Sequence, residues 1–217
     1  MYRCEAGSVE GFVRQLAVAY VGHGYWFYVT GTIPPHKSPD KIDQKIITRY
    51  GIDISRWTRL RQKKRGLAKV QYLRFRRFFV IIATHGEHHF FAEEAKSIND
   101  IRETPLTFHG YSIGYRRGWA DAKWHPSVRI AAERYRRLRR RFEAIAVHRS
   151  VEQLRVEFQR LPFEPWAPVR HQLWSLVRLV NCRRKLANLE LLLFPDLKFK
   201  PRKIRPFDQP GGGGGDV

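Results

Sequence analysis

The segment that most constrains the fold is an apolar run, FFVIIA, at residues 78–83 of a highly charged chain. A run that is apolar at every position buries both faces of a strand, so it predicts a strand at the centre of a sheet. The run completes a longer strand-like stretch from Lys69 to Ala83, which we expect to form one extended strand. The fold must therefore cover both sides of a sheet.

Hydrophobic spacing and helix start and stop residues predict the other elements. Helices are expected over 9–21, 38–50, 90–98, 131–147, 151–160 and 168–193, strands over 25–33, 107–116 and 127–130, and residues 52–66 are ambiguous. This order indicates an α+β fold with an antiparallel or mixed sheet, ferredoxin-like or related. We expect the core to span residues 1–148, a helical part 149–194, and a basic extended tail, rich in Pro and Gly, 195–217.

Net charge indicates the partner. The chain has 41 Lys and Arg against 20 Asp and Glu, a net charge of +21, and such an excess favours a polyanion as ligand. Nucleic acid fits better than a membrane, because no stretch approaches the roughly 18 uncharged apolar residues of a membrane span. Acids in the first twelve residues do not fit a signal peptide.

Cys4 and Cys182 match no zinc or redox spacing, so we expect reduced thiols and a cytoplasmic protein.

The first basic block is residues 61–80, with eight bases and no acid. Within it, RGLAKVQY at 65–72 resembles the octamer of RNA-recognition-motif domains, although Leu67 and Lys69 occupy positions where that octamer has base-stacking aromatics. The resemblance implies a matching first strand at Phe27-Tyr28-Val29, with Tyr28 as a stacking ring. The octamer positions that match are Arg65, Gly66, Ala68, Val70 and Tyr72.

A more general interpretation of this block needs no family. Arginines interleaved with aromatic rings on a strand predict a cationic stacking surface for single-stranded nucleic acid. The alternative is a solvated edge whose rings belong to the core. The residues expected to contact nucleic acid here are Lys63, Lys64, Arg65, Lys69, Tyr72, Arg74, Arg76 and Tyr28.

A second basic block lies on the helix expected at 131–147, where six arginines fall between 134 and 141. Tyr135, Leu138, Phe142 and Ile145 form the inward stripe, so the arginines face outward. Nearly uncompensated arginines suit phosphate, which they bind bidentately. The two blocks bracket a neutral stretch and are expected to converge on one face. The further contacts expected are Arg136, Arg137 and Arg140 on the helix, and Lys198, Lys200, Arg202 and Lys203 in the tail.

Histidines suggest an alternative of another class. Residues 85–91 read HGEHHFF, and His109 follows in a later strand. Rolling-circle replication proteins and single-strand transposases hold a metal on two histidines separated by one hydrophobic residue, and use a helix tyrosine as nucleophile. An HUH-like endonuclease or transposase of a mobile element would place a divalent metal on His85, His88, His89 or His109 and use Tyr135.

The spacing of these histidines does not match that pattern, and Tyr135 belongs to an apolar stripe. We therefore favour a nucleic-acid-binding protein without enzymatic activity or cofactor over the metal-dependent enzyme. RNA, single-stranded or structured, is favoured as the ligand, with single-stranded DNA as the alternative. A structural component of a ribonucleoprotein is a third possibility, and a protein partner is left open. No helix-turn-helix, zinc-finger or basic-zipper signature indicates reading of duplex sequence.

Overall fold

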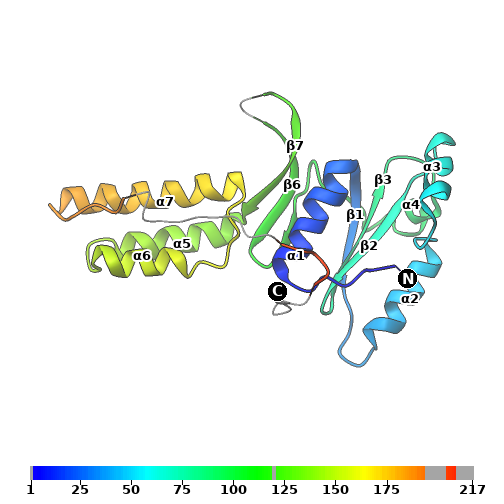
Figure 1. Ribbon diagram of the computed structural model, residues 1–217, viewed down its shortest axis with the longest axis horizontal. Helices are drawn as coiled ribbons and strands as arrows, with labels where there is room; N and C mark the ends of the chain where they lie inside the picture. The colour runs from blue at the N-terminus through cyan, green and yellow to red at the C-terminus, as the bar shows by residue number, and fades with distance from the viewer. Residues whose placement is uncertain (1, 119–120, 194–203, 209–217) are drawn as a thin grey trace, which may run out of the picture. The chain divides into compact units, whose positions relative to one another are not determined.

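The computed structural model describes residues 2–118, 121–193 and 204–208. It confirms an α+β fold with antiparallel sheets of four and three strands and a helical C-terminal part (Figure 1). The described residues divide into two compact units. The first contains residues 2–106, 113–126 and 204–208, and the second contains 107–112 and 127–193.

The first unit contains the four-stranded sheet and the helices that cover it. Its elements are α1 (Val9–Arg14), the π-helix η1 (Gln15–Tyr20), the 3₁₀-helix η2 (Val21–His23), β1 (Tyr25–Thr32), α2 (Pro39–Arg49), α3 (Arg56–Lys64), β2 (Val70–Phe75), β3 (Phe78–Thr84), α4 (His89–Glu93) and β4 (Asn99–Asp100).

The sheet has the order β2-β3-β1-β4, and every neighbouring pair is antiparallel. This order, with helices between β1 and β2 and between β3 and β4, is the split β-α-β arrangement of ferredoxin-like folds. The apolar run lies on β3, between two other strands as predicted. Helices α2 and α4 cover one face, where Tyr72 and Ile81 share a core with Phe90. On the other face, the ring of Phe12 packs 5.8 Å from that of Phe78.

The expected single strand over Lys69 to Ala83 is wrong, because the chain reverses there. Strands β2 and β3 form a hairpin in which Phe75 pairs with Phe78, so Arg76 and Arg77 are the two loop residues. Arg76 has a φ of 54°, a left-handed conformation in which arginine is uncommon. The usual Asn-Gly or Gly signal of a tight hairpin is missing. The sequence pattern therefore predicted one continuous strand across the turn.

Residues from both ends of the described chain complete this unit. Residues 4–6 pair alongside β2, with the amide of Arg74 donating to the carbonyl of Cys4 at 2.7 Å and Ala6 donating to that of Arg74 at 2.7 Å. Pro206 returns to α1, where its carbonyl accepts from the amide of Gly7 at 3.0 Å. A Cβ on Gly11 would lie 2.6 Å from this same carbonyl, so the close approach requires glycine.

The three-stranded sheet has the order β5-β6-β7, and its strands carry residues of both units. The strands are β5 (Leu106–Phe108), β6 (Tyr111–Arg117) and β7 (Trp124–Ile130). The stretch expected as one strand over 107–116 is therefore two, joined by a turn at His109 and Gly110. Both turn residues have a positive φ, 45° and 83°.

The second unit is mainly helical. It contains α5 (Ala132–Ile145), α6 (Val151–Gln159) and α7 (Ala167–Leu186). The rings of Phe142 and Phe158 stack at 4.1 Å between α5 and α6, and α7 buries Leu173, Leu176 and Val180. Helix α5, which the expected boundary at 148 grouped with the core, belongs here, and α7 ends before the expected 193.

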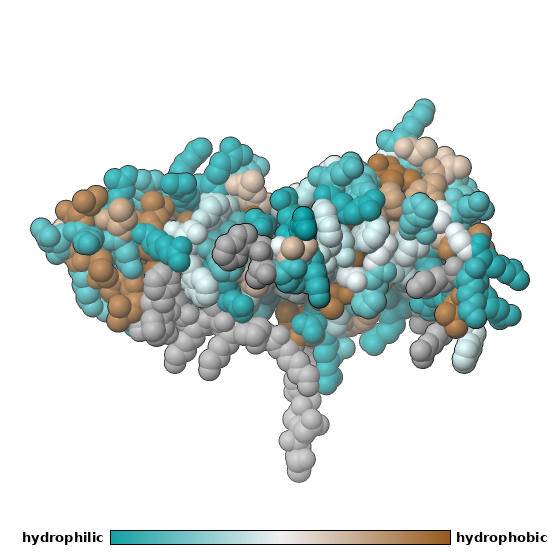
Figure 2. All heavy atoms as spheres, turned by 90° about the horizontal axis from the view of Figure 1, so that it is seen from above, coloured by the Kyte–Doolittle hydropathy of each residue, from teal (hydrophilic) through white to brown (hydrophobic). Residues whose placement is uncertain are grey.

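Apolar side chains also reach the surface of this unit. Figure 2 shows hydrophobic residues gathered over its helices. None of the helices in the described part of the chain has the length and apolar character that crossing a bilayer requires. The exposed apolar residues of the unit are Val147, Val156, Leu186, Leu189, Leu191 and Leu193.

Candidate nucleic-acid interface

A cleft of about 1080 Å³ lies in the first unit, at the edge of the sheet where β1 begins and β3 ends. Strand β2 also begins there, because β1 and β2 each run antiparallel to β3. Tyr25 and Trp26 line the cleft from the start of β1, and Thr84 and His85 from the end of β3. Three strand ends and helix α3 therefore form its walls.

Helix α3 gives the cleft its exposed aromatic side chain. Its sequence, RWTRLRQKK, has five bases and no acid. Trp57 and Leu60, three residues apart on one helix face, line the cleft, with 72% and 46% of their surface exposed. Exposed apolar side chains rimmed by charge mark interaction sites. The sequence left residues 52–66 ambiguous, and the signal missed was this Trp-x-x-Leu spacing within an acid-free basic stretch.

Basic groups complete the walls, namely His23, Arg59, Lys69 and His85. The described residues that line the cleft include no Asp or Glu. Arg59 is fixed in place by donating from Nε and Nη2 to the carbonyl of Ile54, at 3.2 and 2.9 Å. An aromatic cleft with positive walls suits a ligand that has planar rings and negative charge.

Three residues expected at a nucleic-acid surface lie in the interior instead. Tyr72 is fully buried, Tyr28 is 5% exposed and Arg74 is 3% exposed. The hydroxyl of Tyr28 donates to the carbonyl of Thr104 at 2.9 Å. The rings of Tyr28 and Tyr72 are therefore not open for stacking, and the expectation that these two rings and Arg74 contact nucleic acid is wrong.

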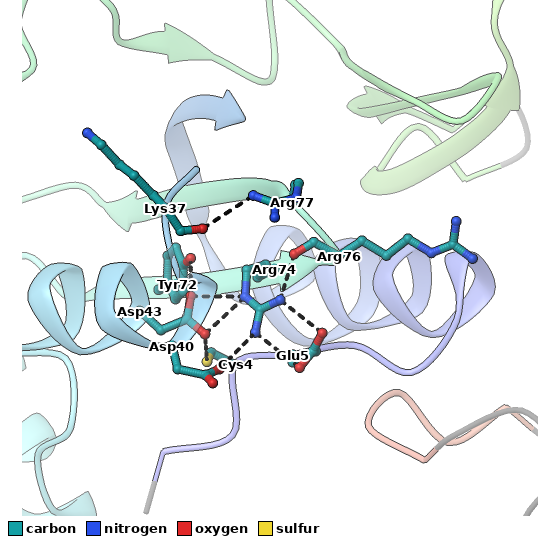
Figure 3. Close-up of polar contacts among 9 residues, drawn as sticks. All are labelled: Cys4, Glu5, Lys37, Asp40, Asp43, Tyr72, Arg74, Arg76 and Arg77. Atoms are coloured by element: carbon teal, nitrogen blue, oxygen red, sulfur yellow. Dashed lines mark hydrogen bonds and ion pairs between the residues drawn. The ribbon is translucent and has the colours of Figure 1, made fainter. Parts of the chain in front are cut away.

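Arg74 is the centre of a buried ion cluster (Figure 3). Its Nε donates to both carboxylate oxygens of Asp43, at 3.0 and 2.9 Å. Its two terminal nitrogens bind the carboxylate of Glu5 at 2.9 and 3.0 Å. Tyr72 donates to Asp43 at 2.6 Å, and burial, followed by this bond to Asp43, raises the pKa of its hydroxyl. Sequence reasoning missed Asp43 because an acid on a basic helix reads as a solvated residue.

Cys4 borders the same cluster, where its thiol donates to Asp43 at 3.3 Å. Burial and the adjacent Asp43 charge raise the pKa of this thiol to about 12. Cys182 is exposed, and both cysteines are free thiols. Cys4 therefore takes part in the cluster as a protonated thiol that donates to Asp43.

The other residues of the first basic block divide between two ends of the β2-β3 hairpin. Lys64 and Arg65 are exposed close to the cleft, and half-buried Lys69 lines it. Arg76 is exposed in the turn at the opposite end of β2, about 20 Å away at the rise of a strand. The side chain of Lys63 and the tail residues Lys198, Lys200, Arg202 and Lys203 lie outside the described residues.

His88 and His89 form hydrogen bonds to backbone atoms of the first unit. Nδ1 of His88 accepts from the amide of Phe90 at 3.0 Å and caps α4, while burial and His89 lower the pKa of His88. His89 stacks on His88 at 4.2 Å and bonds through Nε2 to the carbonyl of Arg49 at 2.9 Å. His85 is exposed beside the cleft. The described residues contain no group of three or more His, Cys, Asp or Glu that could hold a metal.

On α5 the expected orientation is confirmed. All six arginines between 134 and 141 are exposed, and Leu138 and Phe142 are buried. Arg137 forms an ion pair with Glu133, and Arg141 forms one with Glu157. The half-buried Tyr135 donates its hydroxyl to the carbonyl of Gln172 at 3.3 Å, which is the contact of a packed residue.

No family model, curated protein or solved structure matches the chain.

Proposed function

We propose that this protein binds single-stranded nucleic acid, RNA in the first place, through the cleft at the edge of its four-stranded sheet. The observation that carries the proposal is the lining: an exposed Trp57 beside Arg59 and Lys69, with no acid among the described lining residues. The net charge of +21 supplies the long-range attraction. Such a ligand suits a protein of the cytoplasm.

The shape of the site favours a single strand over a duplex. A base can stack on Trp57 only if its face is free, and the faces of paired bases in a duplex are covered by their neighbours. Lys69 and the neighbouring Lys64 and Arg65 offer positive charge to the phosphates on either side. Aromatic stacking combined with a positive groove is the usual way to bind single strands without sequence preference. Binding in this way needs no metal and no bond cleavage.

Replacing Trp57 tests this assignment. We expect Trp57→Ala to weaken binding of a labelled U12 RNA by about 5- to 150-fold, the range for one lost base stack. Trp57→Phe keeps a ring and should retain most of the affinity. Fluorescence anisotropy would measure both, together with a dT12 strand and a 12-base-pair duplex as competing ligands.

Val156→Ala is the matched control, because Val156 is an exposed apolar residue, 42% exposed, in the other unit. If Trp57→Ala binds U12 as tightly as Val156→Ala does, the cleft is not the binding site. Preference for the duplex over U12 and dT12 would also contradict the proposal.

A further inference from the structure

A column of planar groups extends from the cleft to the surface within the first unit. The guanidinium carbon of Arg102 lies 4.4 Å from the ring centre of Trp26. The rings of Trp26 and Tyr115 are 5.5 Å apart, and Tyr115 stacks on Trp124 at 5.8 Å with an angle of 18° between the rings. Trp26 also lines the cleft, so the column begins in the cleft wall.

The Arg102 end of the column is held by hydrogen bonds. Arg102 donates from Nε to both carboxylate oxygens of Asp100, at 2.9 and 3.0 Å. The amide of Ile101 donates to the carbonyl of Trp26 at 2.8 Å. Trp26 therefore contacts both a guanidinium held by Asp100 and the ring of Tyr115.

The outer end is open. Trp124 is 53% exposed, although one ring face is covered by Tyr115. Polar contacts order the hairpin around it, because Arg117 donates from Nε to the carbonyl of Ala122 at 2.8 Å and His125 pairs with Asp121 at 2.6 Å. The exposed bases of this hairpin are Arg116, Arg117 and Lys123, and Arg117 lies on the same face of β6 as Tyr115.

We propose that Trp124 is a second base-stacking site for the same single strand, with Arg117, which lies on the same face of β6 as Tyr115, beside its phosphates. This rests on the proposed function of the cleft. Trp124 is oriented by its contact with Tyr115 and still has 53% of its surface exposed. An aromatic ring already held in orientation loses little entropy when a base stacks on it. The strand thus runs from the cleft, along the β6-β7 hairpin, to Trp124.

The test compares two RNAs, U12 and an abasic 12-mer of the same backbone. Trp124→Ala should weaken U12 binding about tenfold or more, while its affinity for the abasic strand should equal that of the parent protein. Trp124→Phe should restore most of the U12 affinity, and Trp124→Leu, which keeps apolar bulk without a ring, should not. Thermal unfolding of each variant would verify that the fold is retained, and Trp124→Leu replaces Trp124→Ala if the latter unfolds.

The outcomes separate this inference from the proposed function. If Trp124→Ala and Trp124→Leu bind U12 as the parent does while Trp57→Ala binds weakly, the cleft binds RNA and the second site is refuted. An equal loss with the abasic strand would assign Trp124 a role other than stacking and refute it too. If neither tryptophan affects binding, the proposed function itself is wrong.

Discussion

The two arginine-rich segments of this chain use their charge in opposite ways. In residues 61–80, Arg74 is bound by Asp43 and Glu5 inside the protein, and Arg77 donates to the carbonyls of Pro34 and Pro35 at 2.6 and 3.0 Å. On α5, all six arginines are exposed. The density of positive charge along a sequence therefore does not measure the charge that a ligand can reach.

The aromatic residues differ between the two regions as well. Around the cleft, Trp57 stands exposed among bases, so charge and stacking are available together. On α5 the rings of Tyr135 and Phe142 point inward, and the exposed face carries six arginines and no exposed ring. The cleft suits contact with bases and phosphates, whereas α5 suits contact with phosphates alone.

The largest effect is expected from Arg74→Ala. Removing Arg74 leaves Asp43, with 8% of its side chain exposed, as an uncompensated buried charge. Losing one partner of such a pair costs about 3–5 kcal/mol, which urea unfolding would measure as a lower midpoint. Arg76→Ala, two residues further on and exposed, should stay within about 0.5 kcal/mol of the parent. Equal midpoints for the two variants would mean that Arg74 is a surface residue after all.

An intermediate effect is expected on α5. Changing Arg136, Arg137 and Arg140 to alanine should reduce the slope of log affinity against log salt by about 2, since each phosphate contact contributes about 0.7 on single strands. Affinity should fall alike for all sequences, with the fold intact. The same three positions changed to lysine keep the charge and should keep the slope. Trp57→Ala should lower affinity without changing the slope. A changed slope for Trp57→Ala would contradict the difference between stacking in the cleft and phosphate contact on α5.

The smallest effect concerns His88, whose pKa burial and His89 lower in the folded protein. An unfolded histidine takes up its proton near pH 6.5, so the neutral His88 stabilises the fold above that pH. This stabilisation is lost as the pH falls from 6.5 through the lowered folded value. Going from pH 7.5 to 5.5 should therefore destabilise the parent more than His88→Asn, which caps α4 without titrating, by about 1 kcal/mol or less. Parallel urea curves at the two pH values would measure this, and identical losses would contradict it.

The elements that were predicted correctly are those with a strong local pattern. The run at 78–83 identified β3, and the stripe Leu138 to Phe142 oriented α5, because burial of apolar side chains repeats with the period of the element. The hairpin turn at Arg76 was missed, since an arginine in a left-handed conformation leaves no compositional signal. Nothing local distinguishes Arg74, which is buried, from Arg76, which is exposed.

The candidate site shows the same limit. Its walls come from segments near residues 23–26, 57–69 and 84–85, and they meet only because β3 pairs between β1 and β2. A site assembled by strand order cannot be found from spacing along the chain. The sequence shows a tryptophan at position 57, but it does not show that α3 lies beside this edge of the sheet. Trp57 lines the cleft only because of that position.

The return of Pro206 to residues 7 and 11 has a consequence for synthesis. The first unit is interrupted by the second, so a ribosome must translate all of 127–203 before residues 204–208 can bind next to α1. The helical unit, by contrast, is almost contiguous in sequence and can fold while translation continues. Before residues 204–208 are synthesised, the first unit lacks the contacts that they make, including that of Phe207 with Arg3. The contacts of residues 204–208 with residues 3, 7 and 11 can thus form only after the helical unit has been translated.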